Sequence, residues 1–275
     1  MSRKIIVTRD GSLSVEWQDG MTYHSTFGAL QESRHIFIDR GWKNVRQLAF
    51  AQKIVQFPQT ADVCPSDKHL PGAPGSLAAR PYPSEDLMQD GDVSDLPGPG
   101  TSVRVFELGL GTGLNALLTL LEAETMQLPV YYEALEAYPL EAAIFENLDY
   151  CGQLGRPGLQ PKFLQLHTCD WDRPVAISPY FTFYKSRDKW PDYALRQAAE
   201  LVYYDAFDPV VQPELWNAST FKHLAGQLAP GALLLTYCSK GTVRRALQEA
   251  GFCVEKLPGP PGKREMVRAT LVGEK

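Results

Sequence analysis

The sequence lacks the features that would place it in a membrane or outside the cell. Its 275 residues contain no apolar run near the roughly 18 residues that a membrane-spanning helix needs. The N-terminal residues, Met-Ser-Arg-Lys-Ile-Ile-Val-Thr-Arg-Asp, have no long apolar segment after their basic residues, which argues against a secretory signal. We therefore expect a cytoplasmic protein without a membrane partner.

Cysteine and histidine are also scarce. The chain has five cysteines, an odd number without a Cys-x-x-Cys pair, which argues against a disulfide framework or a zinc site. The five histidines show no metal-ligand spacing. We predict that most cysteines are buried free thiols and that the protein has no metal site.

An excess of positive charge is absent as well, since the net charge is −5. Residues 62–100 hold the acidic excess, whereas residues 236–275 are locally basic. A basic end can contact phosphates even when the whole chain is acidic, so the net charge does not exclude a nucleic acid partner. A solvated charged surface explains the same composition equally well.

The apolar content of 44% is typical of a soluble globular protein, and the length allows a large core. Residues 58–100 are rich in proline, glycine and acidic residues, which predicts an extended insertion loop. We divide the chain into an N-terminal β extension and entrance segment (1–57), this insertion (58–100) and a core (101–275). The sequence does not determine the oligomeric state.

Residues 103–115 combine a strand, a glycine turn and the start of a helix. The apolar residues of 103–108 precede Gly109, Gly111 and Gly113, and Leu114-Asn115 opens a run of helical composition. Glycines let a ligand approach the backbone, and the helix start offers free N–H groups. Glu107 lies two residues before the first glycine, where its carboxylate would repel a pyrophosphate and suit a cationic group such as the amino group of S-adenosylmethionine. A turn without a ligand is the alternative.

Strand and helix patterns alternate after this turn, which predicts a parallel sheet with helices on both faces. Strands are predicted at 103–108, 130–136, 162–167, 201–204 and 232–237, and helices at 114–124, 140–148, a segment ending over 195–200, 214–228 and 242–250. The closing strands 252–257 and 265–271 predict an antiparallel edge. Near the N-terminus, 5–7 and 13–17 predict a hairpin, and 43–56 predicts a helix.

Acidic residues follow three of these strands, at the sheet edge where α/β proteins bind ligands. Glu136 is placed to bind ribose hydroxyls, and Asp170 to accept a hydrogen bond from an adenine amino group. Asp205 ends the fourth strand of the core. Each residue has an alternative role as a helix cap or turn residue. Their combination with the glycine turn favours an adenosine-containing cofactor.

Several longer stretches resemble one known family. They are Tyr23-His24-Ser25, Gly28 to His35, Glu107 to Asn115, Asp205-Ala-Phe-Asp-Pro with Gln212-Pro-Glu-Leu-Trp216, Thr236 to Arg245 and Leu257 to Met266. Over residues 20–272, except the insertion, the sequence resembles the tRNA 5-methylaminomethyl-2-thiouridine methyltransferases, found as MnmD and as one half of MnmC. Asp208 departs from the family, which usually has a small residue there. We expect the chain to lack the FAD-dependent half of the bifunctional form.

The resemblance implies a Rossmann-like class I S-adenosylmethionine-dependent methyltransferase fold, mostly parallel. It implies methyl transfer to the primary amine of 5-aminomethyl-(2-thio)uridine at the wobble position, with the tRNA anticodon stem-loop as partner. Asp205 would orient the amine and accept its proton. Phe207 and Trp216 would wall in the extruded base, whereas core packing is the stronger expectation for Tyr204. Phosphate contacts are expected from Lys240, Arg244, Arg245, Lys263 and Arg264. The cofactor-binding set is Glu107, Gly109, Gly111, Gly113, Leu114, Asn115, Glu136 and Asp170.

Two other functions fit the same pattern. A polyamine aminopropyltransferase shares the fold, an aspartate near the fourth strand and an amine acceptor, although it does not require a basic C-terminal segment. A non-catalytic tRNA-binding adaptor on a degenerate methyltransferase fold would not need Glu107, Glu136 and Asp205 together.

Overall fold

The computed structural model describes residues 3–17, 20–44 and 102–272. The predicted insertion loop over 58–100 lies outside the described residues. So does the helix predicted over 43–56, except for Lys43 and Asn44, which are helical.

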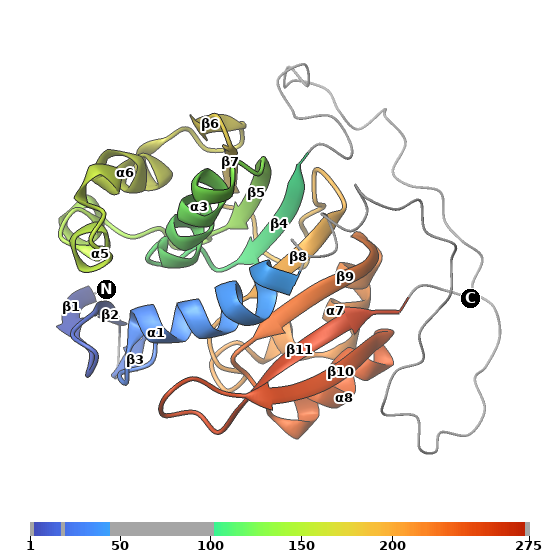
Figure 1. Cartoon of the computed structure of the whole chain (residues 1–275). Helices are drawn as coiled ribbons and strands as arrows, with labels where there is room; N and C mark the ends of the chain where they lie inside the picture. The colour runs from blue at the N-terminus through green and yellow to red at the C-terminus, as the bar shows by residue number, and fades with distance from the viewer. Residues whose placement is uncertain (1–2, 18–19, 45–101, 273–275) are drawn as a thin grey trace, which may run out of the picture.

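The centre of the molecule is an eight-stranded sheet in the order β10-β11-β9-β8-β4-β5-β7-β6 (Figure 1). Its strands are β4 (Val103–Leu108), β5 (Val130–Leu135), β6 (Val175–Ser178), β7 (Phe181–Ser186), β8 (Ala199–Tyr204), β9 (Leu228–Thr236), β10 (Phe252–Pro258) and β11 (Glu265–Leu271). The pairings β7–β5–β4–β8–β9 are parallel. β10 and β11 form the predicted antiparallel C-terminal edge, and β6 adds a second antiparallel edge. The predicted mostly parallel α/β fold is confirmed.

Helices cover both faces of this sheet. One face packs against α1 (Ala29–Ser33), the π-helix η1 (Arg34–Trp42), α3 (Leu114–Met126), α4 (Ala142–Phe145), α5 (Tyr150–Gln153), η4 (Pro157–Leu159) and α6 (Gln160–Thr168). The other packs against the 3-10 helix η5 (Pro213–Trp216), α7 (Ala218–Ala225) and α8 (Gly241–Glu249).

Strand alternation divides the core between these two faces. In β4, Val103 and Val105 belong to the cluster beneath α3, whereas Phe106 and Leu108 belong to the cluster beneath α7 and α8. Successive side chains of a strand point to opposite faces, so a fully buried parallel strand needs apolar residues at nearly every position. Truncating a buried aromatic such as Phe106 to alanine would cost about 3–5 kcal/mol.

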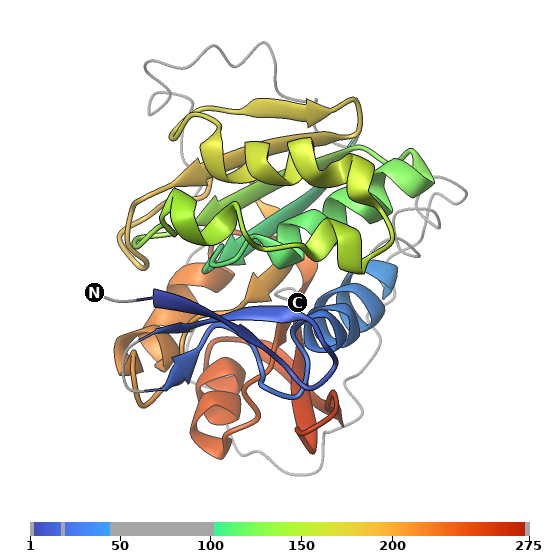
Figure 2. The same ribbon diagram turned by 90° about the vertical axis from the view of Figure 1, so that its left-hand side faces the viewer.

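A separate three-stranded sheet lies at the side of the molecule to which β4 and β5 point (Figures 1 and 2). It consists of β1 (Arg3–Val7), β2 (Leu13–Trp17) and β3 (Met21–Thr22), which include the predicted hairpin. Arg3 Nη1 donates to the carbonyl of Pro139 at 2.8 Å. Gln153 Nε2 donates to the carbonyl of Gly11 at 2.9 Å. The N-terminal extension is thereby fixed against the segments that follow β5.

Two of the predicted elements are wrong. The predicted third strand, 162–167, is part of α6, in which Phe163 and Leu166 are buried at helical spacing after Pro161 in the first turn. The third core strand is β7, paired with β6 in a hairpin. The predicted helix end at 195–200 is also wrong, because β8 already begins at Ala199. A short apolar run does not distinguish a strand from a helix by itself.

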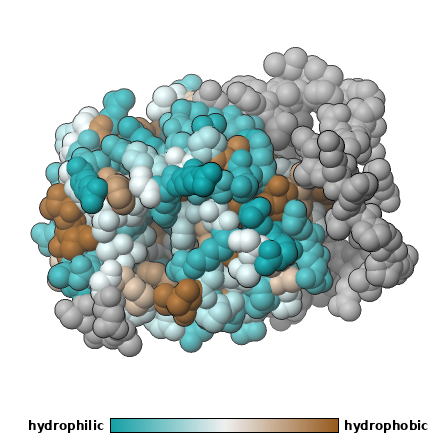
Figure 3. Space-filling view, turned by 90° about the horizontal axis from the view of Figure 1, so that it is seen from below, coloured by the Kyte–Doolittle hydropathy of each residue, from teal (hydrophilic) through white to brown (hydrophobic). Residues whose placement is uncertain are grey.

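The surface seen in Figure 3 is mostly hydrophilic, and its apolar areas are separate small patches. The large exposed apolar side chains of the described residues are Val7, Phe27, Tyr138, Val210, Val211 and Val272. No helix in the described part of the chain is long and apolar enough to span a membrane.

Candidate active site

A cavity of about 600 Å³ lies at the carboxyl ends of β4, β5 and β8. Loops after these strands form one wall, and the N-terminal extension and the β10–β11 loop form the others. Its lining comprises residues 21–27, Glu32, residues 108–112, 135–138, 188–190 and 205–208, Val211, Gln212, Glu214, Leu215, Tyr237, Gly262 and Lys263. The fold therefore brings the N-terminal extension and the β10–β11 loop to the same site.

The glycine turn requires glycine because of its conformation and close packing. Gly109 and Gly111 have φ values of 92° and 52°, in the region that favours glycine. A Cβ atom on Gly109 would lie 2.9 Å from the carbonyl oxygen of Asp205, and one on Gly111 would lie 2.9 Å from the Tyr23 ring. α3 follows at once, after Gly113, and no side chain caps its N-terminus. The first residues of α3 are buried and lie outside the cavity lining, so the turn itself, residues 108–112, is the part that faces the cavity.

Glu136 closes this turn from the end of β5. Its Oε2 accepts the backbone N–H of Gly111 at 2.7 Å, and its Oε1 accepts that of Tyr138 at 2.8 Å. Burial raises the pKa of the Glu136 carboxyl, although these two hydrogen bonds oppose the shift. The carboxylate lines the cavity next to the glycines, where its predicted contact with ribose hydroxyls is sterically possible.

Glu107 lies behind the turn and not in the cavity lining. It is fully buried, and its two oxygens accept hydrogen bonds from Asn115 Nδ2 and the Tyr132 hydroxyl, both at 2.9 Å. Burial raises the pKa of Glu107 well above its usual value. Leu114 and Asn115 are buried beside it at the start of α3. These three residues support the turn from beneath, and their predicted contact with the cofactor stays a prediction.

Asp170 does not occupy the strand end at which it was predicted. It follows α6, its side chain is 67% exposed, and it pairs with Arg173 at 3.1 Å. The acidic residue that does follow the third core strand is Asp188, which lines the cavity and accepts a hydrogen bond from Ser186 at 3.1 Å. The aromatic residues Phe181, Phe183 and Tyr184 before it are the sequence signal for this strand. The predicted adenine contact therefore fits Asp188 better than Asp170.

Asp205 directly follows β8 and lines the cavity. Its backbone N–H donates to the carbonyl of Leu108, and its Oδ2 accepts Asn115 Nδ2 at 2.9 Å. Burial and the nearby Glu32 raise the pKa of Asp205 to about 7, against the opposing influence of Asn115 and Lys263. A carboxyl group with this pKa exchanges a proton readily near neutral pH.

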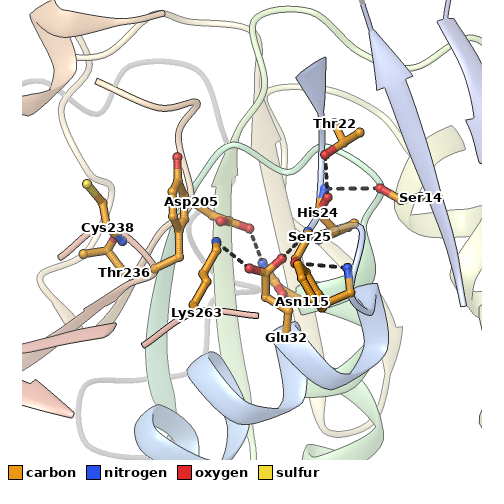
Figure 4. Close-up of polar contacts among 12 residues, drawn as sticks. Ser14, Thr22, His24, Ser25, Glu32, Asn115, Asp205, Thr236, Cys238 and Lys263 are labelled. Carbon is orange, nitrogen blue, oxygen red and sulfur yellow. Dashed lines mark hydrogen bonds and ion pairs between the residues drawn. The ribbon is translucent and has the colours of Figure 1, made fainter. Parts of the chain in front are cut away.

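Glu32 and Lys263 are cavity residues whose interaction sequence reasoning missed. Glu32 Oε1 accepts Lys263 Nζ at 2.6 Å, and its Oε2 accepts the N–H of Ser25 at 2.6 Å (Figure 4). Lys263 Nζ also lies 4.1 Å from the centroid of the Tyr237 ring. Both residues fall in stretches that resemble the family, but 231 positions separate them. No local pattern identifies such a pair.

His24 is a further cavity residue, to which the sequence analysis assigned no role. Its Nε2 lies 2.6 Å from Thr112 Oγ1, so it joins the N-terminal extension to the glycine turn. Burial lowers the pKa of His24 to about 4. The imidazole is therefore neutral at physiological pH.

The aromatic residues predicted to surround the acceptor base have different locations. Phe207 lines the cavity and packs against Trp17 and Tyr23, with both centroid distances 5.3 Å. Trp216 is buried outside the lining, and its Nε1 donates to the carbonyl of Phe207 at 2.8 Å. Tyr204 is also a core residue. Trp216 thus fixes the backbone of Phe207 rather than forming the cavity wall.

The basic residues predicted to contact phosphates differ in their exposure and in their ion pairs. Lys240 pairs at 2.6 Å with Asp208, which lines the cavity, and Lys263 pairs with Glu32 inside the cavity. Arg245 and Arg264 are exposed, and Arg244 is half-buried. Partial burial acts to raise the pKa of Asp208, but hydrogen bonds from Lys240 and the Val210 N–H lower it overall. Phosphate contacts of the exposed Arg245 and Arg264 stay a prediction.

The described residues contain no group of three or more histidine, cysteine or acidic side chains arranged to hold a metal ion. Close packing against Asp205 and Tyr23 requires glycine at positions 109 and 111, and residues 108–112 line the cavity, where an adenosine-containing cofactor is predicted to bind. The carboxylate of Glu136 lines the same part of the cavity and accepts the Gly111 N–H.

The chain is similar to known methyltransferase and tRNA-modification proteins in both sequence and structure. Residues 185–272 match the family model described as S-adenosyl-L-methionine-dependent methyltransferase. The tRNA 5-methylaminomethyl-2-thiouridine biosynthesis bifunctional protein MnmC of Campylobacter hominis is 26% identical over 70% of this chain, and that of Nitrosospira multiformis is 30% identical over 64%. The matched region spans 29% of the length of each relative. The crystal structure of MNMC2 from Aquifex aeolicus superposes with a TM-score of 0.64 at 18% identity, covering 100% of this chain and 73% of that chain.

The sheet order and the superposition on MNMC2 show a class I methyltransferase fold, and residues 185–272 carry the match to the S-adenosyl-L-methionine-dependent methyltransferase model. Within that class, the chain is similar to the methyltransferase of the MnmC and MnmD type, and the resemblance predicted from its motifs is confirmed by the two relatives.

Proposed function

We propose that the protein methylates the primary amine of 5-aminomethyl-(2-thio)uridine at the wobble position of tRNA. The observation that carries this proposal is the position of Asp205, a carboxyl group with a pKa of about 7, in the cavity wall directly behind the glycine turn. The names of the MnmC relatives support the tRNA base as acceptor.

The cavity has two chemically different ends. The donor end contains Gly109, Gly111, Glu136 and Asp188, which offer backbone approach and hydrogen-bond acceptors for an adenosine moiety. When bound there, S-adenosylmethionine supplies an electrophilic methyl group on a sulfonium centre. Asn115 links the support of this end to Asp205.

The acceptor end contains Glu32, Asp205, Phe207, Tyr237 and Lys263. An alkyl ammonium group is attracted by the carboxylates, and Phe207 offers an aromatic face to an extruded base. Ionised Asp205 accepts one proton from the ammonium group. The neutral nitrogen then forms a bond to the methyl carbon as the carbon–sulfur bond breaks, with its electron pair remaining on sulfur. The proton leaves Asp205 for solvent after product release.

An aminopropyltransferase reaction is the second candidate, and one observation favours it. Glu32, Asp205, Asp208 and Glu214 all line the cavity, and such an acidic acceptor site also suits a polyamine. The two reactions differ in donor and acceptor, so a single set of incubations distinguishes them.

The experiment supplies the protein with methyl-labelled S-adenosylmethionine and tRNA that lacks this modification. Label recovered in the wobble nucleoside, with matching release of S-adenosylhomocysteine, is the expected result. Transfer from decarboxylated S-adenosylmethionine to a diamine would establish the aminopropyl reaction instead. Binding of tRNA without any transfer would support the non-catalytic adaptor.

A further inference from the structure

The ion pair between Glu32 and Lys263 joins opposite ends of the chain inside the cavity. Glu32 comes from α1 in the N-terminal segment, and Lys263 comes from the loop between β10 and β11. Their atoms Oε1 and Nζ lie 2.6 Å apart, and the Glu32 side chain is 8% exposed. The Glu32 carboxylate is held in one arrangement, since its second oxygen also accepts the Ser25 N–H.

This pair lies beside the proposed proton acceptor. Figure 4 shows the Lys263 ammonium group next to the carboxyl groups of Glu32 and Asp205. Glu32 acts on Asp205 as a like charge, and Lys263 acts as an opposite charge. The Tyr237 ring covers the ammonium group at 4.1 Å, and the Tyr237 hydroxyl donates to the carbonyl of Ala206, next to Asp205.

The groups near Asp205 come from several parts of the fold, including Tyr132 on β5, whose hydroxyl is bound to Glu107. The charged and titratable ones are Glu107 on β4, Glu32 on α1, Lys263 on the β10–β11 loop, Tyr237 at the end of β9 and Asp208 on the segment of Asp205 itself. Asn115 on α3 contributes a neutral donor. Asp208 is already paired with Lys240, and Glu107 is held by Asn115 and Tyr132.

We propose that Glu32 and Lys263 are positioning residues that set the charge of Asp205 during amine methylation, with opposite signs of effect. Lys263 keeps Asp205 ionised and able to accept the proton, while Glu32 keeps Asp205 basic enough to take it. The pair also fixes the N-terminal extension to the C-terminal hairpin, so that both charges stay in place. This inference depends on the proposed function for its role in the reaction, but not for the charge coupling itself.

The pH profile of methyl transfer tests the coupling because Asp205 must be ionised to act. A neighbouring charge shifts a pKa by about 1–3 pH units. In Lys263→Met, the cation is lost and Glu32 remains, so the acid limb of kcat is expected to move at least about one pH unit upward. In Glu32→Gln, the anion is lost and the limb is expected to move about one pH unit downward.

Two further variants separate charge from structure. Lys263→Arg keeps the positive charge and is expected to leave the acid limb in place. The double variant Glu32→Gln/Lys263→Met removes both charges and is expected to restore the midpoint to within about half a pH unit, because the two effects have opposite sign. The matched control is Glu255→Gln/Arg268→Met, which removes the 2.8 Å pair between β10 and β11 outside the cavity lining. It should not shift the midpoint.

A second readout does not depend on the reaction. The carbon-13 signal of the Asp205 carboxyl group, assigned by its loss in Asp205→Asn, reports its titration midpoint in each variant. Shifts of this signal in the expected directions without methyl transfer to tRNA would support the coupling and refute the proposed function. Methyl transfer with unshifted midpoints in Lys263→Met and Glu32→Gln would overturn the coupling alone. If Lys263→Met does not fold, an unshifted midpoint in Glu32→Gln is sufficient to overturn it.

Discussion

Asn115 donates a hydrogen bond of 2.9 Å from its side-chain amide to Oδ2 of Asp205. The other hydrogen of the same amide nitrogen can serve Glu107 Oε1, also at 2.9 Å. One side chain at the start of α3 thus connects the residue that supports the glycine turn with the proposed proton acceptor. Donor binding and proton transfer share this amide group.

Replacing Asn115 with leucine is expected to impair both sites. A hydrogen bond to the charged form of a carboxyl group favours ionisation, so its loss raises the pKa of Asp205 and moves the acid limb of kcat to higher pH. Leaving buried acceptors without their donor also costs about 1–3 kcal/mol of folding stability. The measurements are a pH–rate profile and urea unfolding. Asn147→Leu, an exposed asparagine on the surface, serves as the control. An unchanged profile in Asn115→Leu would refute the role of the amide.

Asp205→Asn is expected to retain S-adenosylmethionine binding and to lose methyl transfer. Asparagine has nearly the same shape, but it cannot accept the proton, and general base catalysis contributes about 100- to 10,000-fold. Calorimetric titration with S-adenosylmethionine and single-turnover transfer to tRNA measure the two properties separately. Asp188→Asn should give the reverse result, with weaker donor binding and nearly normal transfer at saturation. Turnover of Asp205→Asn near that of the wild type would exclude Asp205 as the base.

Gly109→Ala is expected to abolish tight donor binding. The residue has a φ of 92°, and a Cβ would lie 2.9 Å from the carbonyl oxygen of Asp205, so the glycine turn and the catalytic segment must move apart. Backbone strain of this kind costs about 1–3 kcal/mol. Gly158→Ala is the matched control, because nothing lies within 4 Å of its added Cβ. Fluorescence or calorimetric binding of S-adenosylhomocysteine provides the measurement, and equal affinity in the two variants would contradict the prediction.

Glu133 on β5 is expected to make folding stability fall as pH rises from about 4.5 to about 7. It is buried, accepts the Tyr193 hydroxyl at 2.7 Å and the Arg196 N–H at 3.0 Å, and its pKa is raised by burial to about 7. At a pH below the pKa that the Glu133 carboxyl has in the unfolded protein, this carboxyl is protonated in both the folded and the unfolded state. Between its pKa in the unfolded protein and its pKa in the folded protein, Glu133 is ionised only in the unfolded state. The folded state therefore loses stability as pH rises, by up to about 3 kcal/mol.

Glu133→Gln tests this pH dependence, because glutamine does not titrate. The difference in unfolding free energy between wild type and variant should decrease from pH 4.5 to pH 7 and then stay constant. Denaturant unfolding at several pH values gives this difference. Glu146→Gln, at an exposed position, provides the control. A constant difference across the range would show that Glu133 is not protonated in the folded protein.

The sequence by itself determined the local features. Three glycines between an apolar strand and a helical run required a strand–turn–helix unit, because glycine alone adopts those backbone angles freely. Alternating apolar runs determined the α/β class and the antiparallel C-terminal edge. The strand-end position of Asp205 followed from four apolar residues before it. Placing 162–167 in a strand failed because a six-residue apolar pattern fits both strand and helix.

Only the tertiary structure decided which distant side chains share the cavity. In the structure, Asp188 and not Asp170 follows the third core strand, β7. Trp216 is a core residue and does not line the cavity. Lys263 was predicted as a phosphate contact, yet its ammonium group is bound to Glu32 inside the cavity. Local propensity carries no information about contacts across 231 residues. Such contacts arise when burial of apolar surface brings the N-terminal extension and the C-terminal hairpin together.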